Sequence, residues 1–211
     1  GTKELDDKVT RILNLAYKTT MNKNKPFGNI ASEEHIATAK QVGEEGIVLL
    51  KNQNNVLPID INKAKKIAVI GENAIKIMTV GGGSSSLKAK YEILPLDGIK
   101  SRFGKQSEIK FARGYVGDPG GEYNGVKSGQ DLKESRSADE LLKEAVELAK
   151  SSDYVIFVGG LNKSEYQDNE GIDRKSYGLP YNQDNVISAL AKANKNFAVV
   201  LVSGNAVAMP W

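Results

Sequence analysis

The sequence predicts an α/β domain built on an open, mostly parallel sheet that is sandwiched by helices. Short, continuous apolar runs rich in β-branched residues recur along the chain, as expected for parallel strands that are buried on both faces. Segments with helical apolar spacing lie between several of these runs. This alternation predicts βαβ units with right-handed crossovers.

The amino-terminal part of the chain has the character of a separate element. Residues 3–19 carry apolar side chains at helical spacing with charges between them, which predicts an amphipathic helix. The polar stretch that follows, with Pro26 and Gly28, has the composition of a linker. We therefore divide the chain into the end of a preceding domain at residues 1–24, a linker at residues 25–31 and an α/β sandwich domain at residues 32–211.

A second helix is predicted to begin at Ser32. Ser32 is a suitable N-cap, and Glu33 and Glu34 place negative charge in the first turn, where the helix dipole favours it. The apolar face continues through Ile47 and Leu50, so we expect the helix to end just before residue 52.

The remaining elements follow from apolar runs and helical periodicity. Strands are predicted at residues 66–71, 109–112, 154–160 and 197–204, and helices at residues 138–151 and 182–193. Residues 114–137 are rich in glycine and are expected to form a long surface excursion. Because the sequence stops soon after its last strand, we expect a sandwich that is truncated at its carboxyl end.

The composition excludes several classes of function. The 29 basic and 26 acidic side chains are scattered, which argues against a nucleic-acid partner. The absence of cysteine rules out disulfides and thiolate chemistry, and the single histidine, His35, rules out a histidine-rich zinc site. No apolar run is long enough to span a membrane.

Three loops are predicted to follow strands at the edge of the sheet where open α/β domains bind ligands. The first contains the glycines and serines of residues 81–86, which suit either exposed amides for an anion or sugar, or a tight turn. It matches neither the dinucleotide nor the P-loop pattern, so nucleotide binding is not expected. The third runs from Ser203 to Trp211, an aromatic that suits either sugar stacking or an interface.

The second loop, at residues 161–174, carries the strongest chemical signal. It holds four carboxylates, Glu165, Asp168, Glu170 and Asp173. A glycosidase needs one carboxylic acid as proton donor and a second carboxylate as nucleophile or base. A solvated acidic loop is the alternative, and spacing alone does not choose among the four side chains.

An ordered set of motifs runs through most of the chain. They are residues 40–52 (KQVGEEGIVLLKN), 57–59 (LPI), 66–71 (KIAVIG), 81–85 (GGGSS), 170–174 (EGIDR), 179–180 (LP) with Gln183, and 203–207 (SGNAV). No motif is specific alone, but the whole set in this order resembles the second, C-terminal α/β sandwich domain of glycoside hydrolase family 3, which is β-glucosidase-like. The first helix resembles the last helix of that family's preceding (β/α)-barrel domain.

The resemblance implies an accessory catalytic domain of a retaining, exo-acting β-glycosidase. The nucleophile would be an aspartate of the barrel domain, outside this chain, so the chain alone is expected to be inactive. The second domain would supply the general acid/base, which the resemblance places at Glu170, with Glu165 as the alternative. Asp173 and Arg174 would be supporting residues, and we expect them to form an ion pair that fixes the loop.

The resemblance also implies the partners. These are a β-linked glucoside or oligosaccharide and the preceding barrel domain of the same protein, with neither nucleic acid nor membrane. No metal or organic cofactor is expected. Substrate-binding residues are not assigned, because much of the pocket would lie on the barrel. A periplasmic or secreted location is favoured over a cytoplasmic one. The alternative function is a non-catalytic carbohydrate-binding or structural module that shapes the site of a neighbouring domain.

Overall fold

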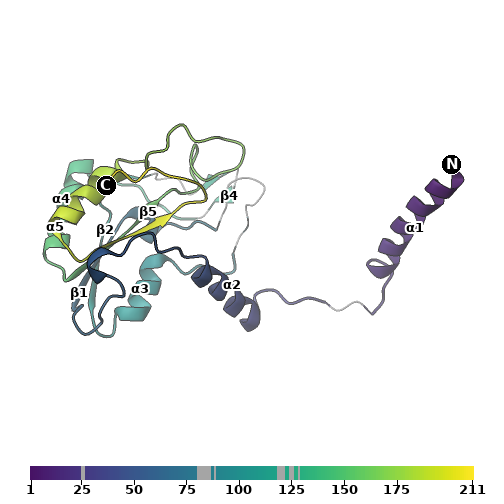
Figure 1. The fold of residues 1–211 in the computed structure, drawn as a ribbon, viewed down its shortest axis with the longest axis horizontal. Coiled ribbons are helices and arrows are strands. Elements are labelled where there is room, and N and C mark those ends of the chain that lie inside the picture. The colour runs from purple at the N-terminus through teal and green to yellow at the C-terminus, as the bar shows by residue number, and fades with distance from the viewer. Residues whose placement is uncertain (25–26, 80–86, 88, 118–121, 124–125, 128) are drawn as a thin grey trace. The chain divides into compact units, whose positions relative to one another are not determined.

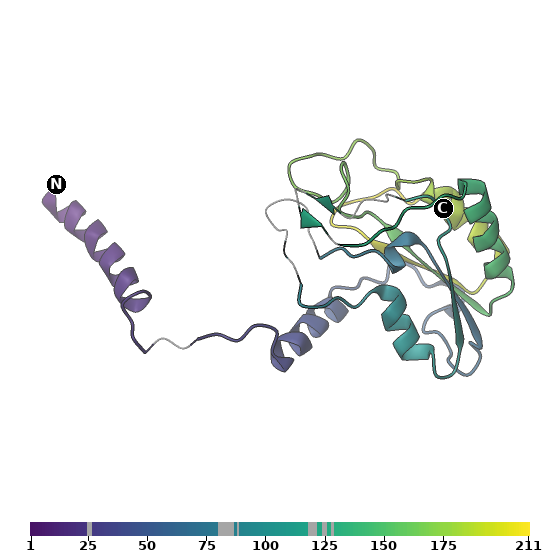
Figure 2. The same cartoon turned by 180° about the vertical axis from the view of Figure 1, so that it is seen from behind.

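A computed structural model describes residues 1–24, 27–79, 87, 89–117, 122–123, 126–127 and 129–211 (Figures 1 and 2). The chain divides into two compact units, residues 1–49 and residues 50–211. No helix within the described residues is long and apolar enough to cross a membrane. The glycine-rich loop at residues 81–86 lies outside the described residues.

The first unit contains two helices, both of which the sequence predicts. Helix α1 spans Thr2–Lys18 and α2 spans Glu33–Glu45. Helix α2 begins as expected, since Ser32 Oγ accepts a hydrogen bond from the His35 amide at 3.3 Å. However, the prediction that α2 continues to residue 51 is wrong. It ends at Gly46. Glycine has low helix propensity, and it has no side chain whose packing could stabilise a further helical turn.

The second unit is built on a four-stranded, all-parallel sheet with strand order β2-β1-β5-β6, which confirms the predicted open α/β fold (Figure 1). The strands are β1 (Lys66–Ile70), β2 (Glu108–Ala112), β5 (Tyr154–Gly160) and β6 (Phe197–Val202). All four lie where the sequence predicts them. The two central strands, β1 and β5, are almost completely buried, as continuous apolar runs require.

Helices cover both faces of the sheet (Figures 1 and 2). Helices α4 (Ala138–Lys150) and α5 (Gln183–Ala193) pack on one face, with α4 starting at a capping box formed by Ser137 and Glu140. Helix α3 (Pro95–Phe103) packs on the other face. Helix α3 is not among the helices predicted from the sequence, because it is short and Leu96 is its single buried residue.

Two apolar clusters form the core, one on each face of the sheet. The cluster under α4 and α5 contains Phe157, and the cluster under α3 contains Ile67 and Val69. The edge strand β6 contributes to only one of them. Its Phe197, Val199 and Leu201 pack against the α4 and α5 side, whereas Val200 is 47% exposed on the opposite face.

Short elements fill the connections. Two 3₁₀ helices, Gln53–Asn55 and Glu72–Ala74, follow α2 and β1, and strands β3 (Glu122–Tyr123) and β4 (Val126–Lys127) form a small antiparallel pair. This pair lies within the glycine-rich segment. The prediction that residues 114–137 form a surface excursion is wrong at the beginning of that segment, where Gly114, Tyr115 and Gly117 are buried.

Candidate active-site loop at the carboxyl edge of the sheet

The four parallel strands end at one edge of the sheet, and the segments that follow them meet there. These segments are residues 71–74 after β1, 113–117 after β2, 161–182 after β5 and 203–206 after β6. The carboxyl edge of an open parallel sheet is the usual position of a ligand site. We call residues 161–178 the acid loop, because they carry the four carboxylates that the sequence singles out.

The base of the acid loop is anchored to the sheet by buried hydrogen bonds. The Gln183 side chain, which is fully buried, donates to the Gly160 carbonyl and accepts from the Gly160 amide, each at 2.8 Å. Asn73, beyond β1, donates from Nδ2 to the Leu161 carbonyl at 3.0 Å. The Leu161 amide donates to the Val202 carbonyl at 2.8 Å. The loop therefore leaves the sheet at a defined point between β1 and β6.

Side-chain amides shape the first half of the acid loop. Gln167 is buried, accepts from the Asn162 amide at 2.9 Å and donates to Tyr181 Oη at 2.7 Å. The Tyr181 ring in turn stacks on the ring of buried Tyr115, with centroids 6.0 Å apart. These contacts connect the loop to the core rather than leaving it as a solvated excursion.

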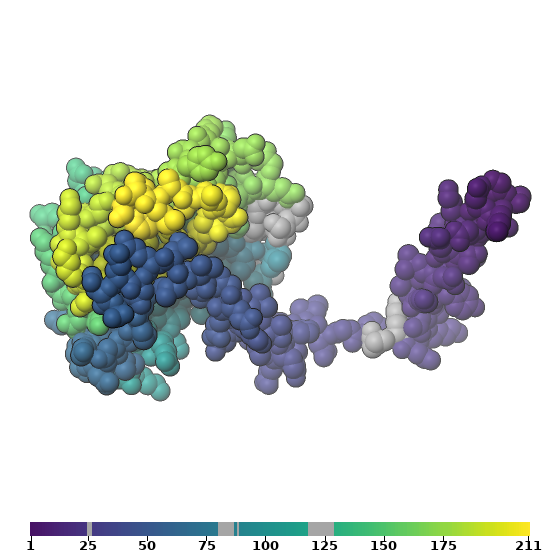
Figure 3. Space-filling model, in the orientation of Figure 1, coloured from purple at the N-terminus to yellow at the C-terminus, as the bar shows by residue number. Residues whose placement is uncertain are grey.

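The four carboxylates of the acid loop have different surroundings. Glu165, Glu170 and Asp173 are exposed, whereas Asp168 is half-buried and faces the turn after β6. Asp168 accepts from the Gly204 amide and from Asn205 Nδ2. In Figure 3 the segment after β6, in yellow, lies beside the loop after β5, in green. The structure therefore brings the second and third loops predicted from sequence together.

Arg174 does not make the predicted ion pair with Asp173. Among the described residues, the Arg174 guanidinium instead donates to Asn205 Oδ1, to the Ala206 carbonyl at 2.5 Å and to the Ser176 carbonyl at 2.7 Å. The Asp173 side chain is exposed. Arg174 is held by the turn after β6 and by Ser176, so its adjacency to Asp173 in sequence does not produce an ion pair.

A buried charged cluster, which sequence reasoning missed, lies beyond β1 and β2. The carboxylate of Glu72 receives two hydrogen bonds from Arg113, from Nη2 at 2.6 Å and from Nε at 3.1 Å, and Lys76 Nζ lies 3.5 Å from its other oxygen. Glu72 is 1% exposed and Arg113 is 7% exposed. The available signal was a charged residue within two positions of the end of each apolar strand, but it becomes meaningful only once β1 and β2 are known to be neighbours.

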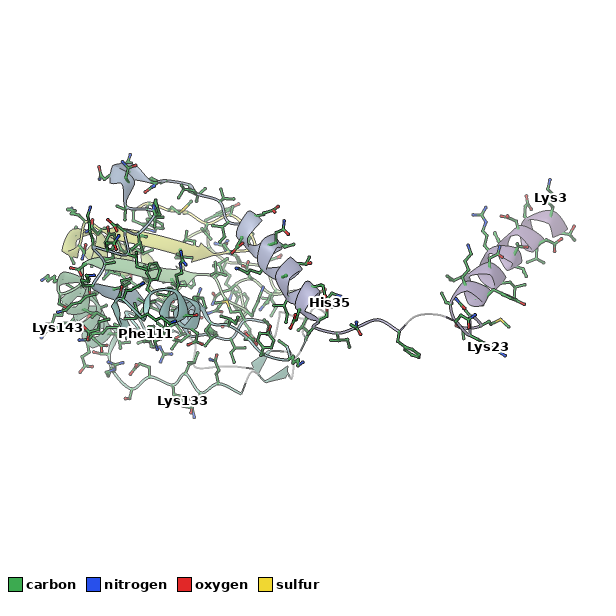
Figure 4. The ribbon with its side chains drawn as sticks, turned by 90° about the horizontal axis from the view of Figure 1, so that it is seen from below. Lys3, Lys23, His35, Phe111, Lys133 and Lys143 are labelled. Carbon is green, nitrogen blue, oxygen red and sulfur yellow. The ribbon has the colours of Figure 1, made fainter. Side chains whose placement is uncertain are left out.

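The buried charged cluster has a polar rim. The Glu72 amide donates to Tyr115 Oη, and burial, with the charge of Glu72, raises the pKa of Tyr115 well above its usual value. Farther out, hydrogen bonds from Arg136 lower the pKa of Glu134 to about 2. Lys133, next to Glu134, projects outward, whereas Phe111 of β2 is partly buried against the apolar cluster under α3 (Figure 4).

The candidate aromatic Trp211 has a structural role at the helix layer. Trp211 donates from Nε1 to Asp184 Oδ1 at 2.7 Å, at the start of α5, which attaches the last residue to the helix layer. Within the described residues, no group of three His, Cys, Asp or Glu side chains has a geometry that could hold a metal ion.

The sequence comparisons decide the family. Residues 47–211 match the family model described as the glycosyl hydrolase family 3 C-terminal domain. The chain belongs to glycosyl hydrolase family 3.

Relatives of this family 3 domain are glycosidases by name. The chain is 48% identical to the beta-glucosidase BoGH3A of Bacteroides ovatus and 31% identical to a beta-xylosidase of Formosa agariphila. The matches cover 98% and 99% of this chain but 27% and 28% of those proteins, so the chain spans about a quarter of their length. Among solved structures, a GH3 beta-glucosidase of Bifidobacterium adolescentis superimposes with a TM-score of 0.70 at 31% identity, over 93% of this chain and 26% of that one.

Proposed function

We propose that this family 3 domain supplies the general acid/base of a retaining, exo-acting β-glycosidase of the β-glucosidase type. Glu170 would protonate the glycosidic oxygen as the leaving group departs, and would then remove a proton from the water that releases the sugar. The observation that carries the proposal is the acid loop, which presents exposed Glu170 from a base that is hydrogen-bonded to the sheet. The name of the 48% identical relative supports the choice of a β-glucoside as substrate.

The second half of the active site would come from a (β/α)-barrel domain of the same protein. The retaining mechanism needs a second carboxylate about 5–5.5 Å from the acid/base. Within the acid loop, the Asp168 carboxylate is already hydrogen-bonded to the turn after β6. A carboxyl group that donates a proton near neutral pH also needs burial or a nearby negative charge. We propose that the barrel supplies both, and that the chain alone is inactive.

The acid/base role is tested by replacing Glu170 with alanine in the full-length protein. Two aryl β-glucosides are compared, one with a poor leaving group that needs protonation and one with a good leaving group that does not. We expect Glu170→Ala to lower kcat/KM for the poor leaving group by about 10²- to 10⁴-fold and to leave the good one nearly unchanged. The 211-residue chain is expected to hydrolyse neither substrate.

Glu165→Ala is the matched control, because Glu165 is an exposed glutamate of the same loop. If Glu165→Ala gives the selective loss and Glu170→Ala does not, the acid is Glu165. If neither variant discriminates between the leaving groups, the domain is a non-catalytic module that shapes the site of its neighbour, and the proposal fails.

A further inference from the structure

We propose that Asn205 is a positioning residue that holds Glu170 in place by joining the two ends of the segment that carries it. This inference rests on the proposed function of Glu170. Asn205 lies in the turn after β6, outside the acid loop, and its side-chain amide contacts the loop on both sides of Glu170. The four residues Asp168, Arg174, Gly204 and Asn205 are called the clasp below.

The Asn205 amide uses its donor and its acceptor on different loop residues. Its Nδ2 donates to Asp168 Oδ1 at 2.8 Å, and its Oδ1 accepts from Arg174 Nη1. An amide offers the two functions on separate atoms, whereas a carboxylate accepts only and an aliphatic side chain does neither. Both bonds involve a charged partner, and such bonds are roughly twice as strong as bonds between neutral groups.

The turn that presents Asn205 is itself held in place. The Gly204 amide donates to Asp168 Oδ2, so the Asp168 carboxylate uses both oxygens on this turn. The Ser203 hydroxyl donates to the Asn205 carbonyl at 2.5 Å, and Arg174 donates to the Ala206 carbonyl. The turn follows β6 directly, so the clasp fixes the acid loop relative to the sheet.

The clasp encloses Glu170 but not Glu165. Asp168 and Arg174 bound a segment of seven residues, and Glu170 is the third of them. Joining the ends of so short a segment restricts the conformations of every residue within it. Glu165 precedes the clasp, in a part of the loop held by the side chains of Asn162 and Gln167. The clasp therefore has contacts on both sides of Glu170 but only on the carboxyl side of Glu165, which makes the inference testable.

The decisive experiment exchanges the two side chains of the clasp in the full-length protein. Asn205→Asp keeps the acceptor for Arg174 but removes the donor to Asp168 and places two carboxylates together. In the double variant Asp168→Asn/Asn205→Asp, the new asparagine supplies the donor and the new aspartate accepts from it and from Arg174. The matched control is Asn185→Asp on α5, because Asn185 is exposed and its side chain makes no hydrogen bond within the described residues.

We expect Asn205→Asp to lower kcat/KM for the poor leaving group by about tenfold to hundredfold, because displacing a catalytic group by about 1 Å can have that effect. The loss for the good leaving group should be less than about threefold, since that bond breaks without protonation. The double variant should recover most of the loss, and Asn185→Asp should behave as the wild type. Melting temperatures of all variants are measured beside the rates.

Two results would overturn the inference. One is an equal loss on both leaving groups, which indicates general damage to the domain. The other is a double variant that recovers no activity although it melts like the wild type. Failure of the proposed function is recognised separately, because Glu170→Ala would then show no selectivity for the poor leaving group. If Glu170→Ala is selective and Asn205→Asp is not, only the role of Asn205 is refuted.

Discussion

Two charged regions lie at the same edge of the sheet and differ in what their charges do. In the buried cluster, Glu72 and Arg113 form a direct ion pair that is almost completely shielded from water. In the acid loop, Asp168 and Arg174 do not pair directly, and each is bonded to Asn205 and to backbone groups after β6. The same side-chain types therefore stabilise the fold in one place and orient an exposed segment in the other.

The difference follows from burial. A charge removed from water is tolerated only if it is paired and hydrogen-bonded, so Glu72 and Arg113 hold each other in one arrangement. Exposed charges remain hydrated and gain little from a direct pair. A dense group of charged residues is therefore not by itself evidence of a catalytic site. In this domain the exposed carboxylates on an anchored loop are the candidates, and the buried pair is structural.

The largest expected effect on stability comes from replacing Arg113 and Arg174 with methionine, one at a time. Arg113→Met would leave the buried Glu72 carboxylate with Lys76 as its remaining basic partner among the described residues, so we expect the free energy of unfolding of β1 and β5 to fall by about 3–5 kcal/mol. Arg174→Met removes exposed hydrogen bonds and should lower stability by about 1 kcal/mol. Hydrogen exchange of the β1 and β5 amides in the full-length protein measures both. Equal losses of stability in the two variants would refute the contrast between the buried charged cluster and the acid loop.

A smaller effect is expected from adding one methyl group to a glycine in each region. A Cβ on Gly117 would lie 1.9 Å from Glu72 Oε2, so Gly117→Ala must displace a carboxylate that Arg113 holds, and should destabilise by about 1–3 kcal/mol. Gly171, next to Glu170, has φ 87°, and apart from its chain neighbours no atom of the described residues lies within 4 Å of an added Cβ. Gly171→Ala therefore adds only backbone strain of about 1 kcal/mol. The same exchange measurement applies, and a larger loss at Gly171 would contradict the packing argument.

The smallest expected effect is a pH dependence of stability at the polar rim of the buried charged cluster. Hydrogen bonds from Arg136 lower the pKa of Glu134 to about 2 from a normal 4.5. Because the folded pKa is the lower one, the resulting stability is present above pH 4.5 and is lost as the pH falls toward 2. Arg136→Gln should flatten this part of the stability profile, as followed by melting temperature against pH. An unchanged acid profile in Arg136→Gln would show that Glu134 does not contribute.

Local sequence patterns predicted most elements because each reflects a local physical requirement. The four apolar runs are strands because buried parallel strands need apolar side chains on both faces, and α4 and α5 follow from their helical spacing. The patterns failed where local preference and packing compete. Helix α2 ends at Gly46 although apolar spacing continues to Leu50, and the short helix α3 has too few buried positions to give a clear period.

The sequence by itself determined the α/β class, the strands, the family resemblance and the loop that carries Glu165 and Glu170. Only the tertiary structure decided which strands are neighbours, and therefore that Glu72 meets Arg113 and that Asn205 meets both Asp168 and Arg174. These contacts join residues that are 31–41 positions apart in the chain. Apolar periodicity reports the environment of one segment at a time, whereas a hydrogen bond between distant side chains depends on strand order and on the exit direction of each loop.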